Sequence, residues 1–386
     1  MGSVNRIATV VLWLRLVLAI SSGIATAAIA PTVRAGVLQT GDILVTDYGM
    51  ASPSGPSDGA LFKVDSITGA RTILSGRGIG TGPMLIDPFG VAVERSGSIL
   101  VTDRSIDSAS GTHRGFVYRV DPVSGDRIEI SGPNRGHGPP LSGPLGPLGI
   151  VVDQDGSIVV ADVTSEDSTP NPGAVLRIDP TNGDRQLVSG LGTGIGPSLD
   201  YPVGIAVAEN GTIFVADPVA HMVHTIEPSS GNRVAIGSLQ GFDGVTDVEV
   251  IGPHTLLINE AISGAIYVVD IVTGQTTLVS GPGLTSIVGD GPAITPVGVG
   301  ISPASDAFYT SCTLSLTPHD AIVQIDWSSG DRTVLSGGGI GAGPEFNTLG
   351  LMTVVSVPEP PTNLTFGLAI ATFAVVRWSR FLRRKP

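Results

Sequence analysis

Acidic side chains stand at the ends of five copies of one short apolar segment in this chain of 386 residues. A carboxylate can bind a divalent cation, transfer a proton, or accept hydrogen bonds from backbone amides. No cofactor is expected, but if the five acids surround one axis they form a ring of oxygen ligands that could hold Ca²⁺. If each lies in its own loop, it caps backbone amides there. The five are Asp47, Asp103, Asp162, Asp217 and Glu260.

The same repeat places acids and arginines where they could pair. In three copies an acid precedes an arginine by six positions across an expected tight turn. Opposite charges across a hairpin attract by roughly 0.2–1 kcal/mol, so we expect cross-strand ion pairs. These are Asp121 with Arg127, Asp179 with Arg185, and Asp326 with Arg332.

Three other patterns are interpreted as structural. Glycine-rich segments such as residues 76–80 recur with the repeat and precede no expected helix, so they indicate turns rather than phosphate-binding loops. His221 and His224 stand three apart on an expected strand and face opposite sides, so they cannot share a metal ion. Cys312 is the only cysteine, which excludes an internal disulfide and a cysteine metal cluster.

The repeated segment defines the expected fold. It reads Ile-Leu-Val-Thr-Asp at 43–47 and 99–103, Ile-Val-Val-Ala-Asp at 158–162 and Ile-Phe-Val-Ala-Asp at 213–217, with weaker copies at 256–260 and 307–311. A strand of the Gly-Ile-Ala-Val type comes before it, and two further strands and a glycine-rich loop follow it. Four short strands in each of six units predict an all-β, six-bladed β-propeller.

The two ends of this propeller complement each other. The chain enters at residues 43–47 without a preceding Gly-Ile-Ala-Val strand, and residues 349–356, Leu-Gly-Leu-Met-Thr-Val-Val-Ser, match the missing strand. We therefore expect the C-terminal strand to pair beside residues 43–47. That pairing closes the first blade and removes two free sheet edges.

The pattern resembles NHL-repeat and gluconolactonase-like six-bladed propellers over nearly all of residues 41–356. The resemblance implies an alternative activity, because gluconolactonase-like propellers hold a divalent metal on the axis through Glu, Asn and Asp from different blades. Asn259 and Glu260 with Asp217 or Asp162 could match that set, whereas the family's metal-binding Glu near the N-terminus has no match. Virginiamycin-B-lyase-like propellers carry a related repeat, but their Trp-Phe-Thr-Glu anchor is absent from this sequence.

The connections between strands predict which face binds. Neighbouring strands of a blade run antiparallel, so the connections after the first and third strands share one face, here called the short-turn face. Those after the second and fourth strands share the opposite, long-loop face and include residues 48–59, 104–115, 163–173 and 312–320. Long loops on a rigid scaffold usually carry binding residues, so we expect the ligand site on the long-loop face.

The N-terminal segment, residues 1–35, is interpreted as a signal peptide. Arg6 and Arg15 supply positive charge to an apolar stretch at 16–30, and small residues follow at Ala25, Ala30 and Ala35. The alternative is an uncleaved membrane anchor.

The C-terminal segment, residues 357–386, has three parts. Pro358, Glu359 and Pro360 precede an apolar run at 364–376, and basic residues that include Arg383, Arg384 and Lys385 end the chain. A short transmembrane helix is expected there, with its basic end cytoplasmic. The order resembles the PEP-CTERM sorting signal, which implies transient anchoring in the inner membrane, cleavage by an exosortase, and release to the cell surface or matrix. The alternative is an ordinary membrane anchor.

Charge narrows the class of partner. The chain has 34 acidic and 21 basic residues, and the two end segments hold one of the acids and eight of the bases. Residues 36–356 therefore keep 33 acids and 13 bases, a net charge of −20. Nucleic acid is disfavoured as a partner because polyanions require the opposite balance.

These features together predict an exported, surface or matrix propeller. It is expected to bind a partner such as an exopolysaccharide or a protein, without catalysis, and no residue is assigned a catalytic role. The alternative is a metal-dependent lactonase or hydrolase, or a lyase, of the propeller types named above. A non-repeated acid, His or Asn at one axial position would mark the site most clearly.

Overall fold

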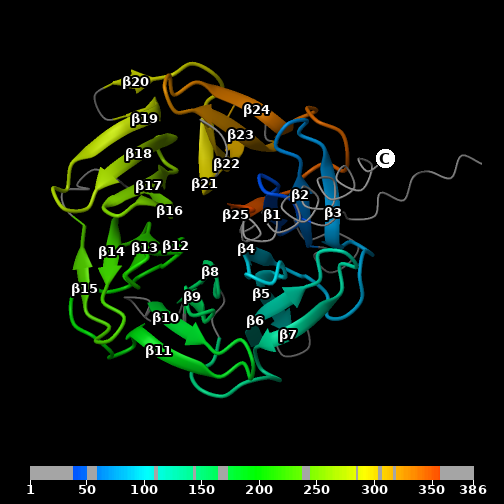
Figure 1. The fold of residues 1–386 in the computed structure, drawn as a ribbon, viewed down its shortest axis with the longest axis vertical. Coiled ribbons are helices and arrows are strands. Elements are labelled where there is room, and N and C mark those ends of the chain that lie inside the picture. Colours follow the sequence, from blue (N-terminus) through cyan, green and yellow to red (C-terminus); the bar gives the residue numbers. More distant parts are fainter. Residues whose placement is uncertain are drawn as a thin grey trace, which may run out of the picture. The chain divides into compact units, whose positions relative to one another are not determined.

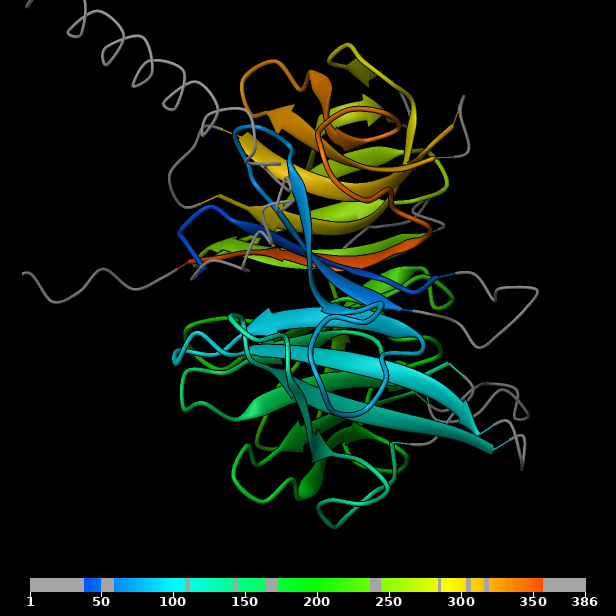
Figure 2. The ribbon, with the colours of Figure 1, turned by 90° about the vertical axis from the view of Figure 1, so that its right-hand side faces the viewer.

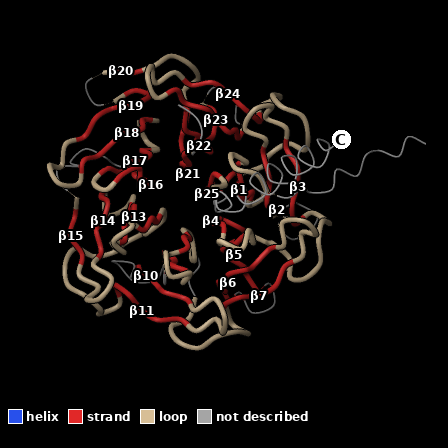
Figure 3. The backbone as a smooth tube through the Cα atoms, viewed as in Figure 1, coloured by secondary structure: helices blue, strands red, loops and turns tan. Residues whose placement is uncertain are grey.

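The computed structural model describes residues 38–49, 59–107, 112–141, 145–163, 173–236, 244–283, 286–302, 307–315 and 319–356. All of them belong to the unit Ala35–Pro386. The expected signal peptide at 1–35 and the sorting tail at 357–386 lie outside the described residues. Among the described residues there is no helix, and therefore none that could cross a membrane (Figure 3).

The described strands form six antiparallel sheets, which confirms the six-bladed β-propeller (Figure 1). In each blade the strands run from the innermost to the outermost in the following order. Blade 1 contains β25 (Leu349–Val354), β1 (Ile43–Asp47), β2 (Ala60–Val64) and β3 (Arg71–Gly76), and blade 2 contains β4 (Pro88–Val93), β5 (Ile99–Asp107), β6 (Thr112–Val120) and β7 (Arg127–Ser131). Blade 3 contains β8 (Ile150–Val152), β9 (Ile158–Val163), β10 (Gly173–Ile178) and β11 (Arg185–Gly190).

Blade 4 contains β12 (Ile205–Val207), β13 (Ile213–Asp217), β14 (Met222–Ile226) and β15 (Arg233–Ala235). Blade 5 has five strands, namely β16 (Val245–Gly252), β17 (Thr255–Glu260), β18 (Ala265–Asp270), β19 (Thr276–Pro282) and β20 (Ile287–Val288). Blade 6 contains β21 (Ile294–Ile301), β22 (Ala307–Leu314), β23 (Asp320–Asp326) and β24 (Arg332–Gly337). The innermost strands surround the axis, and the outermost lie along the perimeter (Figure 1).

The C-terminal strand closes blade 1, as expected from the sequence. β25 pairs antiparallel with β1, with Val354 opposite Ile43 and Leu349 opposite Asp47. The pairing continues past the strand, because Val355 N donates to Asp42 O at 2.8 Å and Gly41 N donates to Val355 O at 2.9 Å. Strands from opposite ends of the chain thus share one sheet.

The second strand of each blade is apolar on both faces because a blade lies on either side of it. In β13, for example, all five residues are buried. Apolar clusters accordingly combine neighbouring blades, as where Val159 and Val175 of blade 3 pack with Val215 of blade 4. Complete burial of one such side chain contributes about 1.5–3 kcal/mol.

Two of the expected long loops are partly strand. β5 continues to Asp107 and pairs there with Thr112 of β6, so most of residues 104–115 is an extended hairpin. Figure 2 shows its two cyan strands side by side. β22 likewise continues through Cys312 to Leu314. Antiparallel strands satisfy each other's backbone groups, so pairing can extend beyond the acid that ends the repeated segment.

Removal of β25 should abolish the closed fold. We expect a chain ending at residue 348 to lose cooperative thermal unfolding, or to form oligomers through the exposed edge of β1, because that edge loses its backbone partners. A chain ending at Ser356 is the control. Circular dichroism melts and size-exclusion chromatography provide the readout, and identical melts for the two chains would refute the proposed closure.

Candidate functional site

The five acids of the repeated segment are buried and lie one strand away from the axis, at the ends of the second strands. Four of them accept backbone hydrogen bonds within their own blades. Asp217, for example, accepts from Asp200 N at 2.7 Å, Tyr201 N at 3.0 Å and Ala220 N at 2.9 Å. The other bonds run from Asn347 N and Thr348 N to Asp47, from Ile86 N to Asp103, and from Ile262 N and Ser263 N to Glu260.

The structure therefore does not bring these acids together as a ring. Within the described residues, no three His, Cys, Asp or Glu side chains are placed to hold one metal ion. The set of Asn259 and Glu260 with Asp217 or Asp162 is also dispersed over the second strands of different blades. Of the two interpretations drawn from the sequence, the geometry matches capping of loop amides.

Asp162 differs from the other four. Both of its carboxylate oxygens are buried without a hydrogen-bond partner among the described residues. Its Oδ1 lies against Gly146, where a Cβ atom would clash. Burial raises the pKa of Asp162 to about 7, so this carboxyl is readily kept neutral.

The prediction of cross-strand ion pairs is wrong: Asp121 and Arg127 do not pair, nor do Asp179 and Arg185 or Asp326 and Arg332. Asp121 instead accepts hydrogen bonds from Val123 N and Ser124 N in its own turn, both at 2.8 Å. Arg127 points to blade 1, where its Nη1 donates to Ser75 Oγ and Ile79 O, and its Nε donates to Pro83 O. The arginine binds the neighbouring blade because the outermost strands follow one another along the perimeter.

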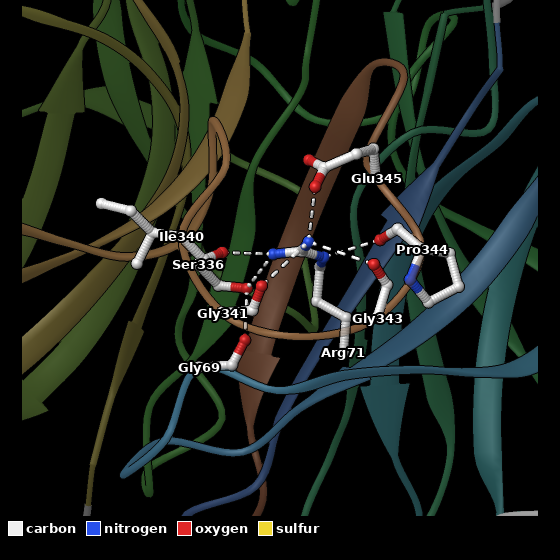
Figure 4. Close-up of polar contacts among 8 residues, drawn as sticks. All are labelled: Gly69, Arg71, Ser336, Ile340, Gly341, Gly343, Pro344 and Glu345. Atoms are coloured by element: carbon white, nitrogen blue, oxygen red, sulfur yellow. Dashed lines mark hydrogen bonds and ion pairs between the residues drawn. The ribbon is translucent and has the colours of Figure 1, made fainter.

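We call this arrangement the arginine latch. The first residue of an outermost strand is an arginine, and the glycine-rich loop of the preceding blade binds its guanidinium group through a serine hydroxyl and two backbone carbonyls. Figure 4 shows the latch between blades 6 and 1, where Arg71 donates to Ser336 Oγ at 3.0 Å and to Ile340 O and Pro344 O, each at 2.6 Å. Glu345 adds a carboxylate there at 2.8 Å.

Five of the six junctions between blades have this latch. Besides Arg71 and Arg127, three more arginines form it. Arg185 donates to Ser131 Oγ, Arg135 O and Pro139 O, and Arg233 donates to Ser189 Oγ, Thr193 O and Pro197 O. Arg332 donates to Ser280 Oγ, Val288 O and Pro292 O. The loop glycines are required because of close approach: a Cβ at Gly82, which has a φ of 98°, would overlap the backbone carbonyl of Arg127.

At the junction between blades 4 and 5 the sequence lacks the arginine and the serine of the latch, and residues 237–243 lie outside the described part of the chain. Thr276 stands at the arginine position of β19, and Gly237 stands at the serine position after β15. Apolar packing holds this junction instead, through a cluster that includes Phe214 and Ile236 of blade 4 with Val248 and Tyr267 of blade 5.

The axis contains a cavity of about 360 Å³, here called the axial cup. Its lining comes from the innermost strands of all six blades, and the residues are Val91, Ala92, Val93, Ile150, Val151, Val152, Ile205, Asp247, Val248, Glu249, Val299, Leu351, Met352, Thr353, Val354 and Ser356. Most belong to the strand halves that lead into the short turns. The cup therefore lies toward the short-turn face, not toward the long-loop face that the sequence favoured.

Apolar side chains close the other end of the axis. Leu148, Val203 and Leu351 form one buried cluster, against which Phe89 and Val297 pack. These five residues come from five different blades, so they meet at the axis on the long-loop side. The cluster forms the floor of the axial cup.

Two acids line the wall of the cup, and both belong to β16. Asp247 and Glu249 are the only acids in any of the six innermost strands. Asp247 accepts hydrogen bonds from Val248 N and from Val299 N of blade 6, both at 2.9 Å. Burial raises the pKa of Asp247 well above its ordinary value and raises the pKa of Glu249 to about 7.

A third polar side chain lies on the same sheet face as these acids. Asn259 of β17 is directly opposite Asp247, so the two side chains share one face. Asn259 is fully buried; its Nδ2 lies 3.5 Å from Thr310 Oγ1, and its Oδ1 has no hydrogen-bond partner among the described residues. The sequence reasoning named Asn259 for another reason and missed Asp247 and Glu249. The sequence did mark these two acids, because Thr-Asp-Val-Glu at 246–249 departs from the Gly-Ile-Ala-Val pattern of the other innermost strands.

The comparisons with known proteins support the fold. No family model matches this chain. A crystal structure of a nidogen/laminin complex contains a chain that matches with a TM-score of 0.55 at 13% identity, over 82% of this chain and 98% of that one. A virginiamycin B lyase from Staphylococcus aureus matches with a TM-score of 0.44 at 17% identity, over 64% of this chain and 69% of that one.

One curated relative shares sequence with this chain. Protein SUPPRESSOR OF QUENCHING 1, chloroplastic, from Arabidopsis thaliana is 28% identical over 172 residues, which is 42% of this chain. The match spans only 15% of that protein's length. The match with a TM-score of 0.55 concerns the fold alone, and none of these likenesses identifies a family or an activity.

Loss of one arginine latch should destabilise the whole propeller. We expect Arg127→Ala to lower the free energy of unfolding by about 2–3 kcal/mol, because charge-assisted hydrogen bonds are lost and buried carbonyls lose their donor. Arg119→Ala is the matched control, since Arg119 forms a more exposed pair with Glu94 that should contribute less than about 1 kcal/mol. Urea titrations measure both variants, and equal losses would contradict the latch.

The buried Asp162 predicts a stability that depends on pH. Its folded pKa is raised, so the folded state retains a proton that the unfolded state loses, and stability falls as pH rises from about 4 to about 7. We expect Asp162→Asn to be more stable than the wild type at pH 8 by about 1–3 kcal/mol, with little difference at pH 4.5. Asp217→Asn, which disturbs three backbone bonds, should lose stability at both values. Thermal melts test this, and a destabilised Asp162→Asn at pH 8 contradicts it.

Proposed function

We propose that this chain is an exported β-propeller that binds a small ligand in the axial cup and does not catalyse a reaction. The observation that carries this proposal is the position of Asp247 and Glu249. The innermost strands of the other five blades present apolar, glycine or hydroxyl residues, whereas β16 alone supplies acids, two of them, to the lining of the cavity. A concave cavity with a few convergent polar groups is a candidate small-molecule binding site.

The scaffold supports a binding role. Arginine latches join five junctions between blades, and apolar residues from five blades fill the floor of the cup. Groups held this firmly lose little conformational entropy when a ligand binds, which favours affinity.

We propose further that residues 1–35 direct export and that an exosortase-type enzyme removes the tail at 357–386, which leaves residues 36–356 at the cell surface or in the matrix. The last strand, β25, ends at Val354, before Pro358, Glu359 and Pro360. Cleavage at or after that motif therefore keeps every strand of the propeller. At the cell surface or in the matrix, residues 36–356 would bind an exopolysaccharide or a protein partner.

Ligand-observed NMR with a mixed library of cationic, neutral and anionic fragments tests the binding site. We expect Thr353→Trp to abolish binding of the hits, because the indole fills the cup that Thr353 lines. Thr333→Trp, on the exposed outer strand β24, is the matched control and should retain binding. Ser356→Trp, at an exposed lining position, gives a second block that leaves the core unchanged. Hits that bind equally to all three variants would refute the cup as the site.

A further inference from the structure

We propose that the axial cup recognises its ligand through a primary ammonium group carried on a short aliphatic body. This inference rests on the proposed function, in that the cup is the ligand site, and adds the chemical class of the ligand. Three features lead to it: two acids of the cup without a cation, an unpartnered acceptor on the strand behind them, and a set of lining residues that is mostly aliphatic and contains no aromatic ring.

The two carboxylates have no positive partner. Neither Asp247 nor Glu249 takes part in an ion pair among the described residues, although Arg and Lys side chains elsewhere pair with seven other acids. Asp247 accepts two backbone amides, and no hydrogen bond to the Glu249 side chain is present in the described part of the chain. Two acids inside one cavity repel each other when both are ionised, so a cation bound between them relieves an unfavourable charge.

The side-chain oxygen of Asn259 is a buried acceptor that lacks a hydrogen-bond donor among the described residues. Buried amide oxygens are normally paired, and a lone one costs free energy. Asn259 lies opposite Asp247 on the same sheet face and is not among the residues that line the cup, so its Oδ1 lies behind the wall. A donor that reaches the Asp247 carboxylate lies on the same sheet face as this acceptor, and one water molecule can bridge the two.

The same observations favour an ammonium group over other cations. A bare divalent metal usually requires more protein ligands, and the described residues offer no group of three His, Cys, Asp or Glu. A quaternary ammonium has no N–H donor and is typically bound by aromatic rings, but the lining contains no Phe, Tyr or Trp. A primary ammonium has three donors and matches the array of acceptors.

The other lining residues indicate the size and polarity of the part of the ligand that carries the ammonium group. Val, Ile, Leu and Met side chains make up most of the wall, and the cavity volume is about 360 Å³. An aliphatic group of modest size fits this lining, whereas a second charged group would lie against apolar side chains without a partner.

Binding should depend on the protonation of Glu249. The titratable group that faces it is Asp247 on its own strand, since β4, β8, β12, β17 near Leu257, β21 and β25 contribute no ionisable side chain there. In the short turns after β4 and β8, Glu94 and Asp153 are paired with Arg119 and Arg177. A cation binds the ionised form, so affinity should fall about tenfold from pH 8 to pH 6 and binding should release a proton.

Isothermal titration calorimetry on the full chain in detergent tests the class of ligand with four matched probes. These are cyclohexylmethylamine, its N,N,N-trimethyl derivative, cyclohexylmethanol and cyclohexanecarboxylate. We expect the amine to bind at least tenfold more tightly than each of the other three. Titrations in two buffers of different ionisation enthalpy detect the released proton.

Two substitutions locate the effect. Glu249→Gln should weaken amine binding at least tenfold at pH 8 and reduce the pH dependence to the part contributed by Asp247, and it breaks no hydrogen bond of the described fold. Glu209→Gln is the matched control, because Glu209 lies exposed in the turn after β12 and is absent from the lining of the cup. It should leave binding unchanged.

Several outcomes would overturn the inference. Equal binding of the alcohol or the trimethyl derivative would show that N–H donors are not recognised. Binding of calcium chloride alone, with no amine binding in calcium-free buffer, would assign the carboxylates to an inorganic cation. If Thr353→Trp still blocks neutral fragments in either case, the cup remains the ligand site and only the ammonium class fails. If nothing binds in the cup, the proposed function fails as well.

Discussion

The arginine latch is the interaction on which the arrangement of the blades depends. Each guanidinium group, as in Arg127 or Arg332, binds the carbonyl oxygens and the serine of the preceding blade, so it ties two sheets that share no backbone ladder. Burial lowers the pKa of both arginines, but the hydrogen-bond acceptors around them offset the cost of removing the charge from water. Apolar packing alone has no direction. The latch supplies a fixed geometry at the perimeter, which holds the innermost strands around the axis.

The one junction without a latch borders the blade that carries the two axial acids. Blade 5 has Thr276 where the other blades have arginine, and its innermost strand has Asp247 and Glu249 where the others have apolar, glycine or hydroxyl residues. Blade 5 thus departs from the repeat both at the perimeter and at the axis. A propeller can accommodate these changes in one blade because the other five junctions and the pairing of β25 with β1 keep the ring closed.

Much of the fold could be predicted, because the repeated segment is written almost unchanged at 43–47, 99–103, 158–162 and 213–217. The number of blades, the closing role of residues 349–356 and the capping role open to Asp217 all follow from that repetition. The pairing of Asp121 with Arg127 was wrong, because separation along a hairpin says nothing about a neighbouring blade that offers better acceptors. The acids of β16 were missed, because an alternating strand does not by itself reveal which positions line the axis.

The sequence by itself determined the six units, their strands and turns, and the strand that closes the ring, since these depend on local pattern and on repetition of that pattern. Only the tertiary structure decided what the polar residues do. The axis and the contacts between blades exist only once six sheets are assembled, so Asp47 and three of its equivalents become loop caps, five arginines become latches, and Asp247 and Glu249 meet in one cavity. The chemistry of a side chain is set by the groups that surround it, and in this protein those groups come from distant parts of the chain.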